Sequence, residues 1–165
     1  MKPFYIVIPT FVLSFIVLFA NAQRQEIPFN KGWQFTGKAV SGKLVEKTVN
    51  VPHTWNATDA QKGISYYRGT GTYEKSFVAK DEWKEQRVFA RFNGVMSIAE
   101  VYLNGELLGE HRGGYSAFIF ELTNKHRFGG ENHLKVVASN EATLDVLPLT
   151  GDFNLYGGMY RPVHL

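Results

Sequence analysis

Six carboxylic acids are the side chains of this sequence best suited to acid–base chemistry. Two carboxylates about 5 to 5.5 Å apart can hydrolyse a glycosidic bond with retention, and wider pairs do so with inversion. The acids here are isolated along the chain, in strand-like runs or on a long loop before the C-terminal residues: Glu74, Glu100, Glu121, Glu141, Asp145 and Asp152. Their spacing pairs no two of them, and a solvent-facing charge explains the strand acids as well.

Aromatic and polar residues gather in two loops. Tyr66, Tyr67 and Arg68 lie together in one loop, and Asp152 and Asn154 in another. Sugars present apolar faces and hydroxyl edges, so aromatic rings with a few charged or amide groups suit a carbohydrate. The alternative is that the tyrosines fill the core of a small β-sandwich.

Two enzyme motifs are incomplete. The stretch 69–71 (GTG) lacks the third glycine of a dinucleotide-binding loop and precedes a strand-like run, so we expect a turn there. The stretch 114–118 (GYSAF) has Phe118 where a nucleophile elbow requires glycine, which argues against a serine hydrolase. Asn56-Ala57-Thr58 matches an N-glycosylation acceptor, a pattern short enough to occur by chance.

The sequence does not indicate a metal site, thiol catalysis or nucleic-acid binding. The five histidines show no HxH or HxxxH spacing, and there is no cysteine. The net charge of +3 is spread along the chain without a basic block. We therefore expect no cofactor, no metal and no nucleic-acid partner.

The N-terminal residues have the pattern of an export signal. Residues 4–20 are almost wholly apolar, follow Lys2 and lead into Ala20-Asn21-Ala22, a small-x-small cleavage site. This predicts a signal peptide over residues 1–22 and a periplasmic, cell-surface or extracellular protein. An uncleaved membrane anchor is the alternative.

Period-two alternation dominates residues 23–165, as in segments 88–92 and 134–138. Asn104-Gly105 between apolar runs predicts a hairpin over residues 101–108, because these residues suit the positive φ angles of a type I′ turn. Further strands are expected near residues 48–51, 72–79, 115–121 and 160–165, with a short helical turn at 81–85. Many short strands between turn residues predict one all-β domain, a jelly-roll β-sandwich over residues 23–165.

Five motifs occur in a distinctive order. They are VPHTW at 51–55, YRGTGTY at 67–73, VYLNG at 101–105, GGYSAF at 113–118 and GGMYR at 157–161. The set resembles the N-terminal sugar-binding domain of glycoside hydrolase family 2, in its β-galactosidase-like branch. The resemblance covers nearly all of residues 23–165 and departs from the commoner ending Tyr-Arg-Asp-Val-Trp-Leu at Pro162 and His164.

The resemblance implies a galactose-binding-domain-like jelly roll that is followed, in the whole enzyme, by an immunoglobulin-like domain and a (β/α)8 barrel. The two catalytic glutamates of the family lie on that barrel, which nothing in this chain matches. We therefore expect no catalytic residue here, a chain truncated within its last strand, and a retaining β-galactosidase as the parent.

The resemblance also implies a supporting role at the active site. In the β-galactosidase branch an aspartate shortly before the Gly-Met-Tyr-Arg stretch hydrogen-bonds sugar hydroxyls, and Asp152 holds that position. A second sugar-facing position falls near Arg68. The expected ligand is a terminal β-linked sugar, a galactoside. A free-standing carbohydrate-binding module and a purely structural docking domain are the alternatives.

Overall fold

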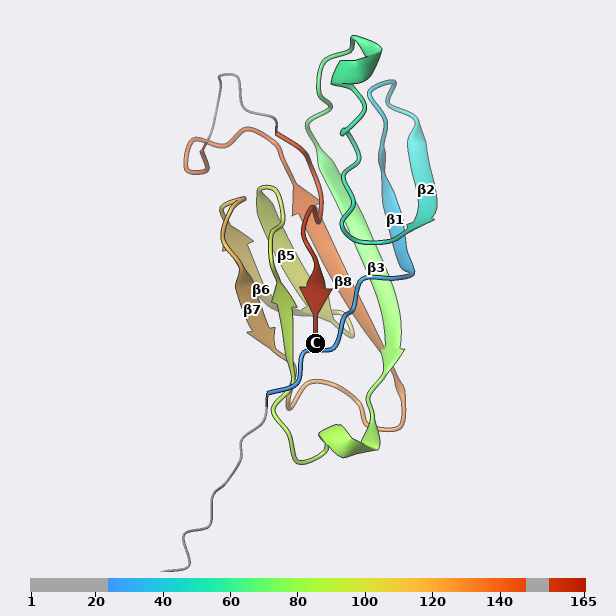
Figure 1. Ribbon diagram of the computed structural model, residues 1–165, viewed down its shortest axis with the longest axis vertical. Coiled ribbons are helices and arrows are strands. Elements are labelled where there is room, and N and C mark those ends of the chain that lie inside the picture. Colours follow the sequence, from blue (N-terminus) through green and yellow to red (C-terminus); the bar gives the residue numbers. More distant parts are fainter. Residues whose placement is uncertain (1–23, 148–154) are drawn as a thin grey trace, which may run out of the picture.

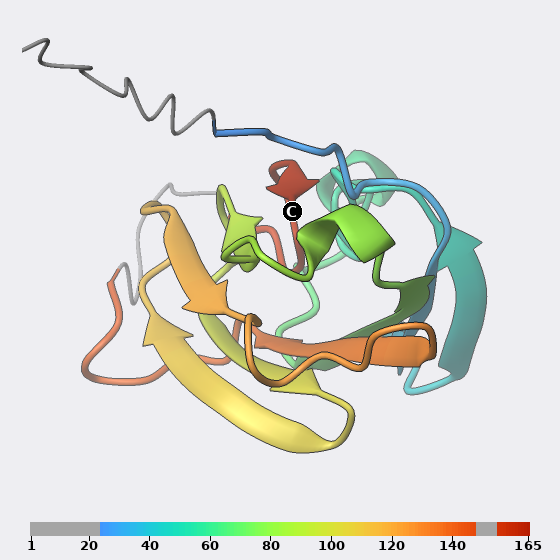
Figure 2. The same ribbon diagram turned by 90° about the horizontal axis from the view of Figure 1, so that it is seen from below.

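Two antiparallel β-sheets pack against each other in the computed structural model, which describes residues 24–147 and 155–165 (Figure 1). The large sheet has the order β2-β1-β3-β8-β5-β6, formed by Leu44–Val49, Trp33–Lys38, Thr70–Val78, Glu131–Ser139, Ile98–Leu103 and Glu106–Arg112. The small sheet has the order β7-β4-β9, formed by Phe118–Glu121, Phe89–Phe92 and Val163–His164. Figure 2 shows the small sheet over one face of the curved large sheet. The predicted all-β class is thus confirmed.

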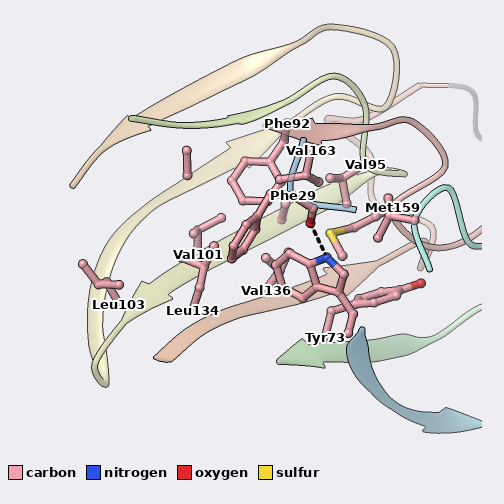
Figure 3. Packing of buried hydrophobic residues seen from close by; sticks show 14 of the residues in the cluster. Phe29, Tyr73, Phe92, Val95, Val101, Leu103, Leu134, Val136, Met159 and Val163 are labelled. Carbon is pink, nitrogen blue, oxygen red and sulfur yellow. Dashed lines mark hydrogen bonds between the residues drawn. The ribbon is translucent and has the colours of Figure 1, made fainter. Parts of the chain in front are cut away.

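The core lies between the two sheets because alternate side chains of each strand point inward. On β8 the buried apolar residues are Leu134, Val136 and Ala138, which follow period two. Phe92 and Val163 meet them from the small sheet (Figure 3). Burial of each large apolar side chain contributes about 1.5–3 kcal/mol, so this interlayer core holds the sandwich together without disulfides.

Local sequence signals place several elements correctly. Asn104 and Gly105 have φ angles of 53° and 87°, and they join β5 to β6 as the predicted hairpin. The helical turn expected at 81–85 is the 3-10 helix η2 (Asp81–Trp83), and a second, η1, covers Ala60–Lys62. Strand β3 includes almost all of the predicted segment 72–79.

Other strands differ from their predicted bounds. Only Thr48 and Val49 of the segment 48–51 belong to β2, which starts at Leu44, and the segment 115–121 pairs only from Phe118. The segment 160–165 forms a strand only over Val163–His164, since Pro162 lacks an N–H group, and Leu165 exchanges backbone hydrogen bonds with Ile27. Strand β1 was not predicted, because Gly37 interrupts its apolar alternation after Trp33 and Phe35. Gly37 leaves room for the Phe35 ring, which a Cβ there would meet at 2.5 Å.

The predicted signal peptide, residues 1–22, lies outside the described residues. Among the residues that the structure does describe, no helix has the length and apolarity needed to cross a bilayer.

Candidate functional site

Arg68 and the described residues that flank the segment of Asp152 lie at one end of the sandwich, where β3 begins and β8 ends. Figure 1 shows the loop before β3, the loop after β8 and the chain leading to β9 at this upper end. Arg68 is half-buried in the loop that enters β3. It lines a small hollow together with Asn140, Glu141, Leu147 and Leu155. The hollow has room for about one water molecule, so a sugar would have to bind across its open side.

Asp152, the first predicted sugar contact, lies outside the described residues, as does Asn154. The structure does place the residues on either side of this segment. Leu147 and Leu155 both line the hollow that Arg68 lines. The two described residues that flank the segment 148–154 therefore lie beside Arg68.

Asn56 is fully buried and joins the two loops. Its Nδ2 donates to Tyr67 O and to Leu155 O, each at 3.0 Å. Its Oδ1 accepts from Gly157 N at 3.0 Å. Both ends of this carboxamide are thus satisfied by backbone groups of segments that are far apart in the sequence.

Asn140, just after β8, binds the same loops from the other side. Its Nδ2 donates to Leu155 O at 2.8 Å and to Tyr67 O at 3.4 Å, and its Oδ1 accepts from Gly69 N at 2.8 Å. The carbonyls of Tyr67 and Leu155 therefore each accept from both asparagines. We call the side chains of Asn56 and Asn140, with their backbone partners at residues 67, 69, 155 and 157, the amide clamp.

The amide clamp changes the interpretation of the Asn56-Ala57-Thr58 motif. Asn56 has 0% exposure and both of its amide hydrogens are engaged. In the folded domain this nitrogen is therefore closed to glycan attachment, and the motif has a structural role.

Asp59 is a third buried polar residue at this end. Its Oδ2 accepts a hydrogen bond from Tyr67 N at 3.1 Å. The chain around Arg68 is thus held at Tyr67 N, Tyr67 O and Gly69 N, which fixes the backbone on both sides of the arginine.

Two tyrosines flank the same loops. The rings of Tyr66 and Tyr156 meet edge to face, with centroids 5.8 Å apart. Loss of solvation, followed by a hydrogen bond with Tyr156, raises the pKa of Tyr66. The Tyr66 phenol is therefore protonated at neutral pH. Tyr66 was among the predicted aromatic residues, whereas Tyr156 was missed.

The paired glycines before β9 lie on an aromatic layer. A Cβ at Gly157 would collide with the Trp55 indole, and one at Gly158, whose φ is +122°, with the Tyr73 hydroxyl. Trp55 is stacked on Phe35 with ring centroids 6.0 Å apart. The Trp55 ring therefore packs directly against the backbone of Gly157 and Gly158.

His53 belongs to this supporting layer. Its Nδ1 shares a hydrogen bond of 2.8 Å with the Tyr73 hydroxyl, and its backbone N donates to Met159 O. Burial, with a smaller effect of the Lys47 charge, lowers the pKa of His53 to about 4. The ring is therefore neutral at physiological pH. No cluster of three potential metal-binding side chains occurs within residues 24–147 and 155–165.

Of the five candidate acids that the structure describes, Glu121 and Asp145 have arginine partners. Glu121 forms a bidentate pair with Arg87, at 3.0 and 2.7 Å, on the small sheet. Asp145 accepts from Arg112 Nε and Nη2 at 2.7 and 2.9 Å, which fastens the loop after β8 to the end of β6. Both acids act as ion-pair partners in the described structure.

The residues that sequence reasoning missed are Asn140, Asp59 and Tyr156, together with the true role of Asn56. The only local signal for Asn140 is an uncharged polar residue directly after a strongly alternating strand. Asn56 and Leu155 are 99 residues apart in the chain, so no local pattern relates them.

Comparison with known proteins agrees with this fold. The sequence profile described as "Glycosyl hydrolases family 2, sugar binding domain" matches residues 33–165. A β-glucuronidase of Bacteroides fragilis is 51% identical over 156 residues, which cover 92% of this chain and 22% of the relative. A β-galactosidase of Thermoanaerobacterium thermosulfurigenes is 32% identical over 156 residues, covering 86% of this chain and 21% of the relative.

Solved structures of similar fold also come from β-glucuronidases and β-galactosidases. A β-glucuronidase from Bacteroides uniformis has a TM-score of 0.77 at 37% identity, over 86% of this chain and 18% of that protein. A putative β-galactosidase from Bacteroides fragilis has a TM-score of 0.75 at 43% identity, over 85% of this chain and 22% of that protein. The chain thus spans about a fifth of the length of such relatives. It belongs to the sugar-binding domain family of family 2 glycosyl hydrolases.

Proposed function

We propose that this domain positions the terminal sugar of a β-linked glycoside in the active site of a family 2 enzyme, through Asp152 and Arg68. One observation carries the proposal: Arg68 lines the same hollow as Leu147 and Leu155, the residues that bracket the segment containing Asp152. A carboxylate accepts hydrogen bonds from sugar hydroxyls and a guanidinium donates them. The two side chains thus supply complementary contacts from one end of the sandwich.

The rest of the proposal concerns the whole protein. Residues 23–165 are a jelly-roll domain exported behind a signal peptide of residues 1–22. Hydrolysis, with retention, takes place on a separate barrel domain that follows an immunoglobulin-like domain. The coverage of about a fifth of each relative supports this division. Residues 23–165 alone then orient a sugar without cleaving it.

The sugar itself has two candidates. The ordered motifs favour a galactoside. The relative with 51% identity is named a β-glucuronidase, which makes a terminal glucuronide the second candidate. A glucuronide carries a carboxylate at C6, and an arginine side chain binds a carboxylate in a bidentate manner that lysine cannot reproduce. Arg68 is the described residue at this end best suited to that contact.

The test measures kcat/KM of the whole enzyme on nitrophenyl β-galactoside and nitrophenyl β-glucuronide. Asp152→Ala should lower kcat/KM on the preferred substrate about 10- to 100-fold, since a hydrogen bond to a charged group is lost. Arg68→Lys should affect the glucuronide more than the galactoside. The control is Asp81→Ala, which removes an exposed aspartate from η2 at the opposite end of the sandwich.

Two results would contradict the proposal. An Asp152→Ala enzyme with unchanged kcat/KM on both substrates would show that this side chain makes no productive sugar contact. Turnover by residues 23–165 alone, at rates typical of a whole enzyme, would place catalysis in this domain. Saturable micromolar binding of a sugar by residues 23–165, abolished by Asp152→Ala, would instead identify a free-standing carbohydrate-binding module.

A further inference from the structure

The amide clamp binds the backbone on both sides of Arg68 and at Leu155, the first described residue after the segment that contains Asp152. We infer that Asn56 and Asn140 are positioning residues, which hold the backbone on both sides of Arg68 in a fixed relation to Leu155, the first described residue after the segment of Asp152. This inference rests on the proposed function. It concerns two side chains that are buried, with exposures of 0% and 3%, and so act only through the backbone that they bind.

The hydrogen bonds of the amide clamp to Tyr67 and Gly69 form its first arm. They fix the backbone from which the Arg68 side chain extends. Tyr67 O accepts from both asparagines, at 3.0 and 3.4 Å, and Gly69 N donates to Asn140 Oδ1 at 2.8 Å. Asn140 N also donates to Gly69 O at 3.1 Å. The peptide groups on both sides of Arg68 are therefore tied to the end of β8, which belongs to the middle of the large sheet.

The second arm of the amide clamp fixes Leu155, the first described residue after the segment 148–154. Leu155 O accepts from Asn56 at 3.0 Å and from Asn140 at 2.8 Å, and Gly157 N donates to Asn56 Oδ1 at 3.0 Å. Before the segment, the bidentate contact of Asp145 with Arg112 ties down the loop after β8. The described chain is thus anchored at Asp145, before the segment 148–154, and at Leu155, after it.

Carboxamides suit this task because each supplies two donors and an acceptor without charge. A buried carboxylate would repel the carbonyls of Tyr67 and Leu155, and a buried ammonium would leave the N–H groups of Gly69 and Gly157 unpaired. Removing one carboxamide leaves two carbonyls with fewer donors and one N–H without an acceptor. The two loops can then shift relative to each other, and a misplacement of about 1 Å can lower a rate about 100-fold.

A second buried asparagine on the same strand provides a stability-matched control. Asn132, at the other end of β8, has 0% exposure. Its side chain donates to Arg127 O and Gly130 O, at 2.8 and 3.2 Å, and accepts from Arg127 N at 2.6 Å. Asn132 thus also hydrogen-bonds the backbone of a loop, but it does so about one strand length away from Arg68.

The experiment compares Asn140→Ala, Asn56→Ala and Asn132→Ala in the whole enzyme. All three should lower the melting temperature of this domain by about 5–10 °C. At a temperature where all three are folded, Asn140→Ala and Asn56→Ala should lower kcat/KM about 10- to 100-fold. Asn132→Ala should leave kcat/KM within about twofold of wild type. Asn140→Ser, which retains one hydroxyl, serves if the alanine variant does not accumulate as folded enzyme.

A second readout separates positioning from general loosening. In an enzyme that already carries Asp152→Ala and Arg68→Ala, Asn140→Ala should reduce kcat/KM no more than about twofold, because the contacts that it orients are gone. Equal losses for Asn132→Ala and Asn140→Ala, or an undiminished Asn140→Ala effect in that background, would overturn the inference. If Asp152→Ala and Arg68→Ala together leave kcat/KM unchanged, the proposed function fails instead.

Discussion

Protonation of His53 should destabilise the domain in mildly acidic solution. His53 lies beneath the glycine pair of the site, next to Tyr73, with a pKa lowered from 6.5 to about 4 by burial and by Lys47. The folded domain thus favours the neutral ring, and the unfolded chain takes up the proton first. The stability that depends on neutral His53 is present above about pH 6.5 and is lost as the pH falls towards 4.

The size of the effect follows from the shift in pKa. A change from 6.5 to about 4 corresponds to about 3 kcal/mol at 1.36 kcal/mol per pKa unit. Because His53 is only half-buried, solvent screening reduces this to about 1–2 kcal/mol. The pKa of Glu121, lowered to about 2 by Arg87, means that the loss of its pairing energy begins only below about pH 4.5. His53 should therefore dominate the difference measured between pH 7.5 and 4.5.

The assay is urea unfolding of residues 23–165 and of the His53→Gln variant, followed by tryptophan fluorescence at several pH values. Between pH 7.5 and 4.5 the wild-type domain should lose about 1–2 kcal/mol more unfolding free energy than the variant, whose side chain does not titrate. Parallel pH profiles of the two proteins, or a wild type that gains stability relative to the variant at low pH, would refute this account of the layer beneath the site.

Three further predictions concern single positions. Gly157→Ala should destabilise the domain by about 1–3 kcal/mol, because the new methyl group collides with Trp55, whereas Gly130→Ala, where the nearest atom is 3.8 Å away, should be nearly neutral in thermal unfolding. Gly105→Ala should cost about 1–2 kcal/mol of unfolding free energy, since its φ is +87°, and an unchanged melting temperature would argue against the type I′ turn. The folded domain, treated with an oligosaccharyltransferase and a lipid-linked glycan, should gain no glycan mass at Asn56, and mass spectrometry that finds one would contradict its burial.

The parts of the fold that the sequence predicted are those controlled by neighbouring residues. Asn104-Gly105 defines its hairpin within a few residues, and the alternation in β8 reports its own buried face. Strand β1 was not predicted because Gly37 stands where the alternation calls for an apolar side chain. Glycine is needed there to leave room for the Phe35 ring, and a two-residue pattern does not reveal such a packing requirement. The short β9 depends on pairing with β4 and on Asn30, whose Oδ1 accepts from Val163 N at 2.7 Å.

The candidate site was less predictable for the same reason. Arg68 was named from its place in a motif, and the structure sets it beside both ends of the Asp152 segment. The amide clamp could not be predicted, because Asn56 and Gly157 are 101 residues apart and Asn140 and Tyr67 are 73 apart. A buried asparagine and an exposed one look alike until tertiary structure brings backbone groups to them.

A crystal structure of the whole enzyme with a slowly hydrolysed glycoside bound would show whether this domain touches the terminal sugar. We expect an Asp152 carboxylate oxygen within about 3.2 Å of a hydroxyl of the terminal sugar, and the Arg68 guanidinium on the same sugar. A terminal sugar bound in the barrel with no atom of residues 23–165 within about 4.5 Å, the range of a direct contact, would contradict it.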